Sequence, residues 1–92
     1  MPQKPKVVFK PAAFKHGFGP EDYWAVVRNR HLVAKSRRGL ANVYEILGRN
    51  DGGEYVQVIT RRGLTNSGKV IIVFHMSTMR KSERRLFQKL VR

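Results

Sequence analysis

The fold of this chain is decided by residues 69–76, which read Lys69-Val70-Ile71-Ile72-Val73-Phe74-His75-Met76. Residues 70–74 are five consecutive β-branched or aromatic residues, a run too short for a core helix and of the right length for a strand. A continuous apolar run of this kind is typical of a central strand that is buried on both faces. We therefore expect this segment to form the central strand of a sheet.

A basic amphipathic segment follows the strand directly. Its apolar residues recur at helical spacing, and arginine and lysine fill most of the other positions. The pattern predicts a helix over about residues 79–91, with Ser77 or Thr78 as its N-cap. The helix would pack back onto the sheet. Strand and helix would then bring together His75, Arg80, Arg84 and Arg85.

The rest of the chain predicts two helical segments and three more strands. A short turn of helix is expected over residues 11–16, ended by Gly17, and a helix over 20–29. Strands are expected over 31–35, 42–49 and 55–61, with a hairpin at the Asp51-Gly52 turn and a loop over 62–68. Residues 7–9 read as a short edge strand.

Short connections favour antiparallel neighbours, so the predicted fold class is α+β. It has N-terminal helices, a four-stranded antiparallel meander and a C-terminal helix, with the helices against one face of the sheet. The length of 92 residues predicts a single domain over residues 1–92, of which residues 1–6 form a loose basic tail.

Charge is the main clue to the partner. Nineteen basic residues face six acidic ones, which gives a net charge of +13. Self-repulsion on this scale is typical of proteins that bind a polyanion or an acidic protein. The alternative is a basic surface that serves solubility alone, which acidic residues would serve equally well.

The composition also argues against several classes of site. The chain has no cysteine, so we expect neither disulfides nor thiolate metal ligands. The same absence predicts a cytoplasmic location. No apolar run approaches the roughly 20 residues that cross a bilayer, so no membrane partner is expected. His16, His31 and His75 lack the spacing of a helical metal site. We therefore expect no metal and no cofactor.

Cleavage of a phosphodiester in RNA is the chemistry that remains. RNA supplies its own nucleophile, the ribose 2′-hydroxyl, whose proton a histidine can accept. An arginine can stabilise the charge that develops on the phosphate. The candidate catalytic residues are His75, Arg80, Arg49 and His16. Ser77 lies two residues from His75, so both side chains would share a face if the strand continues, but this pair alone is a weak sign of a nucleophilic triad.

Further residues are candidates for RNA binding, because cations hold phosphates and aromatic rings stack on unpaired bases. They are Lys15, Arg61, Arg62, Arg84, Arg85, Tyr44 and Tyr55. Each candidate has a structural alternative. The arginines can be solvated surface charge, and either histidine can be a partly buried residue with satisfied hydrogen bonds.

The sequence resembles the BrnT-like toxins of bacterial type II toxin–antitoxin systems, which belong to the wider RelE-like ribonucleases. The residues that carry the resemblance are Lys15-His16-Gly17 with Pro20-Glu21-Asp22, Ile46-Leu47-Gly48-Arg49 with Asp51-Gly52, and Glu83-Arg84-Arg85-Leu86-Phe87. The resemblance implies a RelE-like fold and an endoribonuclease toxin that acts on messenger RNA. It also implies an acidic antitoxin as partner.

The chain departs from the family at two places. The first strand and helix are shorter here, and the family's arginine after the last strand falls on Ser77. Arg80 can take the place of that arginine only if the final helix begins late.

Two further readings stay open: a non-catalytic module that binds RNA or the ribosome, and a DNA-binding antitoxin. The second is disfavoured, because no helix-turn-helix or ribbon motif stands out.

Overall fold

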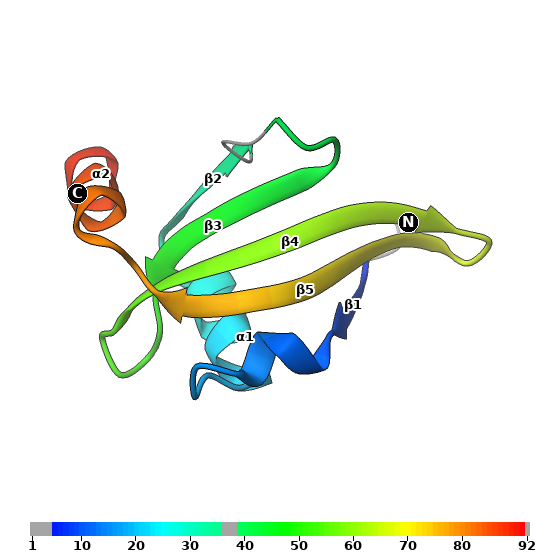
Figure 1. Ribbon diagram of the computed structural model, residues 1–92, viewed down its shortest axis with the longest axis horizontal. Helices are drawn as coiled ribbons and strands as arrows, with labels where there is room; N and C mark the ends of the chain where they lie inside the picture. The colour runs from blue at the N-terminus through cyan, green and yellow to red at the C-terminus, as the bar shows by residue number, and fades with distance from the viewer. Residues whose placement is uncertain (1–4, 36–38, 92) are drawn as a thin grey trace.

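The computed structural model describes residues 5–35 and 39–91. Its elements in chain order are β1 (Lys6–Phe9), the 3₁₀ helix η1 (Pro11–Phe14), α1 (Pro20–Arg28), β2 (His31–Lys35), β3 (Val43–Arg49), β4 (Tyr55–Thr65), β5 (Gly68–Thr78) and α2 (Lys81–Leu90). The strands form one sheet in the order β1-β5-β4-β3-β2 (Figure 1). Of the predicted N-terminal tail, residues 1–4 lie outside the described residues, and Lys6 already belongs to β1.

The sheet corrects the predicted fold class. It has five strands and is mixed, because β1 pairs with β5 in parallel, from Lys6 opposite Val70 to Phe9 opposite Val73. The predicted four-stranded antiparallel meander was therefore wrong, although β2 to β5 do pair as antiparallel neighbours. The chain between β1 and β5 is long enough to return in the same direction, as parallel pairing requires. A short apolar strand such as β1 gains burial by this pairing.

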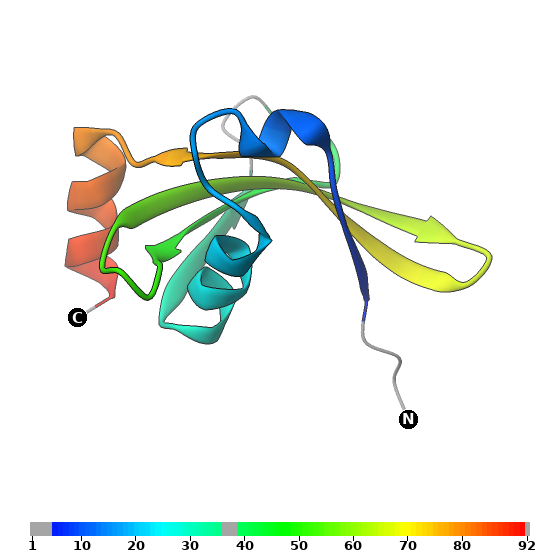
Figure 2. The ribbon, with the colours of Figure 1, turned by 90° about the horizontal axis from the view of Figure 1, so that it is seen from below.

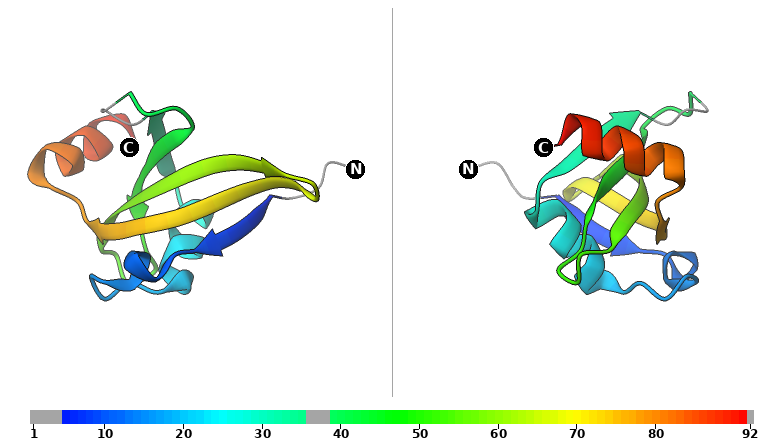
Figure 3. Two further views of the ribbon diagram at one scale, coloured as in Figure 1. Left: turned by 45° about the vertical axis from the view of Figure 1, so that its right-hand side comes forward. Right: turned by 90° about the vertical axis from the view of Figure 1, so that its left-hand side faces the viewer.

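The helices cover opposite faces of the sheet, which corrects the expectation that they share one face (Figure 3). On one face, η1 and α1 enclose the larger core, which includes Val26, Val58 and Met76. On the other face, α2 crosses one end of the sheet and buries Phe87 against Leu47. Both faces carry apolar side chains at this end, so both need a cover.

Strands β4 and β5 extend further than predicted. Residues 62–65 continue the ladder, and the turn between the strands is reduced to residues 66 and 67. The predicted loop over 62–68 was wrong because its glycines and polar residues lie in an exposed hairpin. Pairing with β3 ends at Arg61 and pairing with β1 ends at Val70, so the hairpin tip projects beyond the rest of the sheet (Figures 1 and 2).

A β-bulge interrupts the pairing of β4 with β5. Ile59 lies opposite His75 and Thr60 opposite Val73, so Phe74 has no partner on β4. As a result, Val73 and Met76 both enter the core under α1, while His75 lies on the opposite face. Residues 70–72 and 74 are only half-buried, so the prediction of a strand buried throughout on both faces was wrong.

Helix α2 begins later than predicted. Its N-cap is Arg80, and neither Ser77 nor Thr78 caps it, because both belong to β5. The buried Glu83 carboxylate accepts a hydrogen bond of 2.8 Å from the Arg80 backbone N–H. An acidic side chain in the first turn satisfies a free backbone donor and complements the helix dipole. Within residues 5–35 and 39–91, no helix is long and apolar enough to cross a membrane.

Candidate functional site

His16 and His75 meet at the edge of β5. Their ring centroids lie 5.3 Å apart, with an angle of 68° between the rings. The pairing of β1 ends at Val73, and the Lys10 backbone N–H still bonds the Val73 carbonyl at 2.8 Å. The chain then leaves the sheet into η1, and the segment after η1 brings His16 beside the part of β5 that β1 leaves uncovered. Two of the four predicted catalytic residues therefore come together.

A chain of hydrogen bonds extends from His75 across the sheet face. His75 Nε2 lies 2.9 Å from Ser77 Oγ, which lies 3.3 Å from Gln57 Oε1. The Gln57 amide nitrogen donates to Glu83 Oε2 at 2.5 Å and also to Glu45 Oε1. The expected shared face of His75 and Ser77 is thus confirmed. We call His16, His75, Ser77 and Gln57 the histidine site.

The donors and acceptors fix which way each hydrogen bond in this series points. Two carboxylates accept from Gln57, so its amide nitrogen must face them and its oxygen must face Ser77. The Ser77 hydroxyl donates to that oxygen, which leaves the Ser77 oxygen to accept from His75. The proton of a neutral His75 ring is thereby assigned to Nε2, and Nδ1 keeps its lone pair.

The surroundings of His75 favour its neutral form. Burial of the half-buried ring lowers the pKa of His75 most, and the neighbouring charge of His16 lowers it further. The carboxylate of Glu83 acts in the opposite direction and only partly offsets these effects. A neutral imidazole with a free Nδ1 is a proton acceptor at neutral pH.

Arg80 lies between the histidine site and α2. It is exposed, it follows the last residue of β5 by two positions, and its backbone N–H binds the same Glu83 that receives Gln57. Because the helix begins at Lys81, Arg80 precedes it. This late start is the condition under which Arg80 can replace the arginine of the resembling family.

Arg49 belongs to a separate cluster. Its guanidinium carbon lies 5.0 Å from the Tyr55 ring centroid, and that of Arg84 lies 4.3 Å from the same centroid. The Gln88 side chain donates to the Tyr55 hydroxyl at 3.1 Å. That hydrogen bond, followed by the charges of Arg49 and Arg84, lowers the pKa of Tyr55. We call the space beside these residues, between the β3–β4 turn and α2, the tyrosine cleft.

The remaining candidates for RNA binding are divided among other places. Arg62 lies over Tyr44, 4.1 Å from the ring centroid, on the face of the sheet opposite His75. Arg61 is exposed on β4, Arg85 is exposed on α2, and Lys15 is exposed beside His16. The seven candidates therefore do not line one continuous surface.

Three polar residues of the site were missed by the sequence analysis: Glu45, Gln57 and Glu83. Glu45 and Gln57 interrupt the apolar alternation of two predicted neighbouring strands. Glu45 lies opposite Ile59 and Gln57 opposite Leu47, so the two are diagonal neighbours on one face. A polar residue on each of two neighbouring apolar strands was the signal that could have found them. Glu83 was noted only as part of a family motif.

No model of a known protein family matches this sequence, and no curated protein is significantly similar to it.

Proposed function

We propose that this protein is a metal-independent endoribonuclease that cleaves single-stranded RNA, including messenger RNA, at the histidine site. The observation that carries the proposal is the contact between His16 and His75, with rings 5.3 Å apart. The lowered pKa of His75 and its free Nδ1 support a role as proton acceptor. The net charge of +13 supports an RNA substrate.

The reaction needs one proton acceptor and one proton donor. His75 Nδ1 accepts the proton of the ribose 2′-hydroxyl, and the 2′-oxygen then forms a bond to the adjacent phosphorus. The bond from phosphorus to the 5′-oxygen of the next nucleotide breaks, and His16 donates a proton to that leaving oxygen. The products are a 2′,3′-cyclic phosphate and a free 5′-hydroxyl. Arg80 stabilises the negative charge on the phosphoryl oxygens.

We further propose that the protein acts as a toxin in the cytoplasm and that an acidic antitoxin neutralises it. The support is the resemblance to BrnT-like toxins at three short motifs and the position of Arg80 before α2. The ribosome is a further proposed partner in this role.

The experiment is an RNA cleavage assay in EDTA with matched histidine variants. We expect wild-type protein to cleave a single-stranded RNA and to leave the all-deoxy oligonucleotide intact. His75→Ala and His16→Ala should each lose about 10²–10⁴-fold in rate, the usual contribution of a general acid or base. His31→Ala is the control, because His31 lies on β2 and binds the Asn29 carbonyl. Equal rates in all three variants would contradict the proposal.

A non-catalytic RNA-binding module is the second candidate. The observation that favours it is that exposed cations also lie away from the histidines, such as Arg62 on the opposite face of the sheet. Binding that weakens steeply with salt, without cleavage, would support it.

The toxin role has its own test. A growth defect on expression of this protein, relieved by a small acidic protein encoded by the neighbouring gene, would support it.

A further inference from the structure

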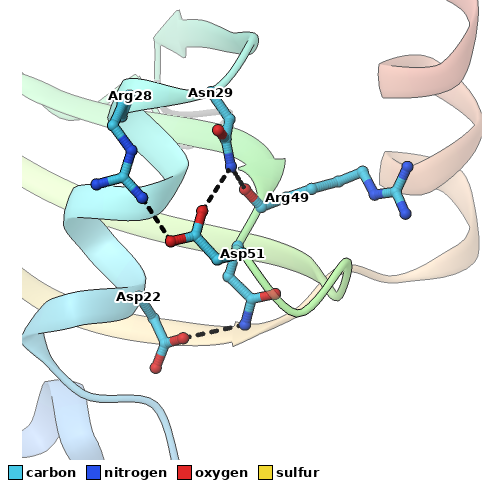
Figure 4. A network of polar contacts seen from close by, with 6 residues as sticks. Asp22, Arg28, Asn29, Arg49 and Asp51 are labelled. Atoms are coloured by element: carbon cyan, nitrogen blue, oxygen red, sulfur yellow. Dashed lines mark hydrogen bonds and ion pairs between the residues drawn. The ribbon is translucent and has the colours of Figure 1, made fainter.

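The carboxylates near the tyrosine cleft are already engaged with other groups. Arg28 contacts Asp51 at 2.5 Å, and the Asn29 side chain donates to the same carboxylate at 3.5 Å. The amide of Asn50, which is 7% exposed, donates to Asp22 at 3.0 Å. It also donates to Glu54. Figure 4 shows the contacts of Asp22, Arg28 and Asn29 with the β3–β4 turn, and the side chain of Arg49 pointing away from them toward α2.

Arg49 and Arg84 remain without a carboxylate. Among the described residues, neither guanidinium forms an ion pair, and the contacts of both are with the Tyr55 ring. Arg49 Nε also donates to the Gly53 carbonyl at 3.1 Å, which holds the side chain along the turn. Two exposed cations close to one aromatic ring repel each other, and an anion bound to both would offset that repulsion.

The space beside Arg49 and Tyr55 is large enough for part of a nucleotide. The tyrosine cleft has a volume of about 520 Å³. Its walls include Arg49, Tyr55 and Gln88, together with Asp51, whose carboxylate Arg28 engages. Arg84 is not part of these walls and reaches the cleft only over the Tyr55 ring. Aromatic surfaces with a few polar groups are typical of ligand sites, and guanidinium groups suit phosphate oxygens.

The cleft lies next to the histidine site but is separate from it. Tyr55 and Gln57 share one face of β4, and Glu83 and Arg84 are consecutive on α2. Ile59, opposite His75, lies four residues from Tyr55 along the strand, which corresponds to about 13 Å. A short single strand of RNA can reach both places at once.

We propose that the tyrosine cleft is a phosphate-binding subsite for the RNA strand, outside the cleavage centre. Arg49 and Arg84 bind the oxygens of one phosphodiester of the strand. Tyr55 positions the two guanidinium groups through its ring, so its role is to orient cations and not to stack on a base. The identity of the strand as RNA rests on the proposed function.

The test measures binding of a labelled all-deoxy oligonucleotide, which lacks the 2′-hydroxyl and stays intact. We expect the double variant Arg49→Ala/Arg84→Ala to bind at least tenfold more weakly than wild type. The slope of log affinity against log salt is negative and should become shallower by about 0.7, the value for one phosphate contact on a single strand. Lys89→Ala is the control, because it removes a cation from the same helix, whereas the described cation contacts of the Tyr55 ring are those of Arg49 and Arg84.

Every outcome of this measurement decides the proposal once circular dichroism shows that the variants are folded. A double variant that matches Lys89→Ala in affinity and slope would overturn it. So would a wild-type protein that does not bind the oligonucleotide. A mononucleotide or inorganic phosphate that binds as tightly as the oligonucleotide would assign the cleft to a free anion and overturn a strand subsite.

The outcome is distinguishable from failure of the proposed function. His75→Ala should bind the oligonucleotide like wild type but lose cleavage of RNA. The double variant should show a raised KM and an unchanged kcat, because the cleft acts in binding only. Arginine-dependent binding by a wild-type protein that does not cleave RNA would leave the subsite standing and reject the nuclease.

Discussion

His75 is bonded to Ser77 on its own strand, with 2.9 Å between Nε2 and Oγ, and both side chains lie on the sheet face that α2 partly covers. This hydrogen bond connects the ring to Gln57 and, through it, to two carboxylates. The imidazole is therefore held in one orientation by residues of β3, β4, β5 and α2. A ring fixed in this way is suited to chemistry at its other nitrogen.

The two charged neighbours of His75 should shift its pKa in opposite directions. In wild type we expect a midpoint below about 6.5, the ordinary value for histidine. His16→Ala should raise the pKa of His75, because a repelling charge is removed, and Glu83→Gln should lower it. Nitrogen-15 NMR against pH measures both. A midpoint that neither variant moves would contradict the assignment of these neighbours.

Stability should fall on mild acidification because of the same residue. The pKa of His75 is lower in the folded chain than in the unfolded chain. Between the two values the unfolded state binds more protons, so the free energy of unfolding decreases as pH falls below about 6.5. Urea denaturation at several pH values measures this. His75→Gln should show a flatter profile below pH 6.5, and an unchanged profile would contradict the prediction.

Loss of the Ser77 hydroxyl should impair the orientation of His75. We expect Ser77→Ala to slow RNA cleavage by about tenfold to a hundredfold, as a small misplacement of a catalytic group does, with RNA affinity unchanged. Ser77→Thr keeps the hydroxyl and should restore most of the rate. The nitrogen-15 shifts of His75 should show a mixed tautomer in Ser77→Ala alone. A purely structural role for Ser77 would leave the tautomer unmoved.

Gln57 should matter for folding as well as for orientation. Gln57→Leu leaves the carboxylates of Glu45 and Glu83 without their shared donor, so we expect it to cost about 1–3 kcal/mol of unfolding free energy. Gln88→Leu is the control, because Gln88 is exposed and its partner Tyr55 can bind water. Equal stability of the two variants would argue against a stabilising role for this partly buried network.

Gly48 should be intolerant of a side chain. A Cβ at this position would lie 2.9 Å from Val26 Cγ1 and 3.1 Å from His31 Cβ. Gly48→Ala should therefore cost about 1–3 kcal/mol through overpacking between α1 and β3. Gly52→Ala is the matched control in the adjacent turn, since its nearest contact is 3.5 Å. Thermal unfolding compares the two, and similar melting temperatures would contradict the close packing of α1.

Local signals in the sequence were sufficient for much of the secondary structure. Pro20 begins α1 as predicted, and Asp51 and Gly52 form the turn between β3 and β4. Both signals act through the backbone conformation of the residue itself and need no distant partner. The pairing of β1 with β5 could not be predicted in this way, because it joins segments at opposite ends of the chain and leaves no local period.

The candidate site could be predicted only in part, because local signals again reach only residues on one element. His75 and Ser77 share a strand, so their common face could be inferred from alternation. The approach of His16 depends on where β1 stops pairing, and the role of Gln57 depends on strand register and on the place of α2. The clustering of Arg49 with Tyr55 and Arg84 likewise follows from the tertiary position of α2.

The unpaired residue Phe74 shifts the phase of side-chain alternation along β5 by one position. In an uninterrupted strand of the same sequence, His75 and Ser77 would point with Val73 into the apolar layer beneath α1, and Met76 would face outward. An imidazole enclosed there would lose contact with any substrate. The exposure of a reactive side chain on β5 therefore depends on Phe74, the one extra residue that has no partner on β4.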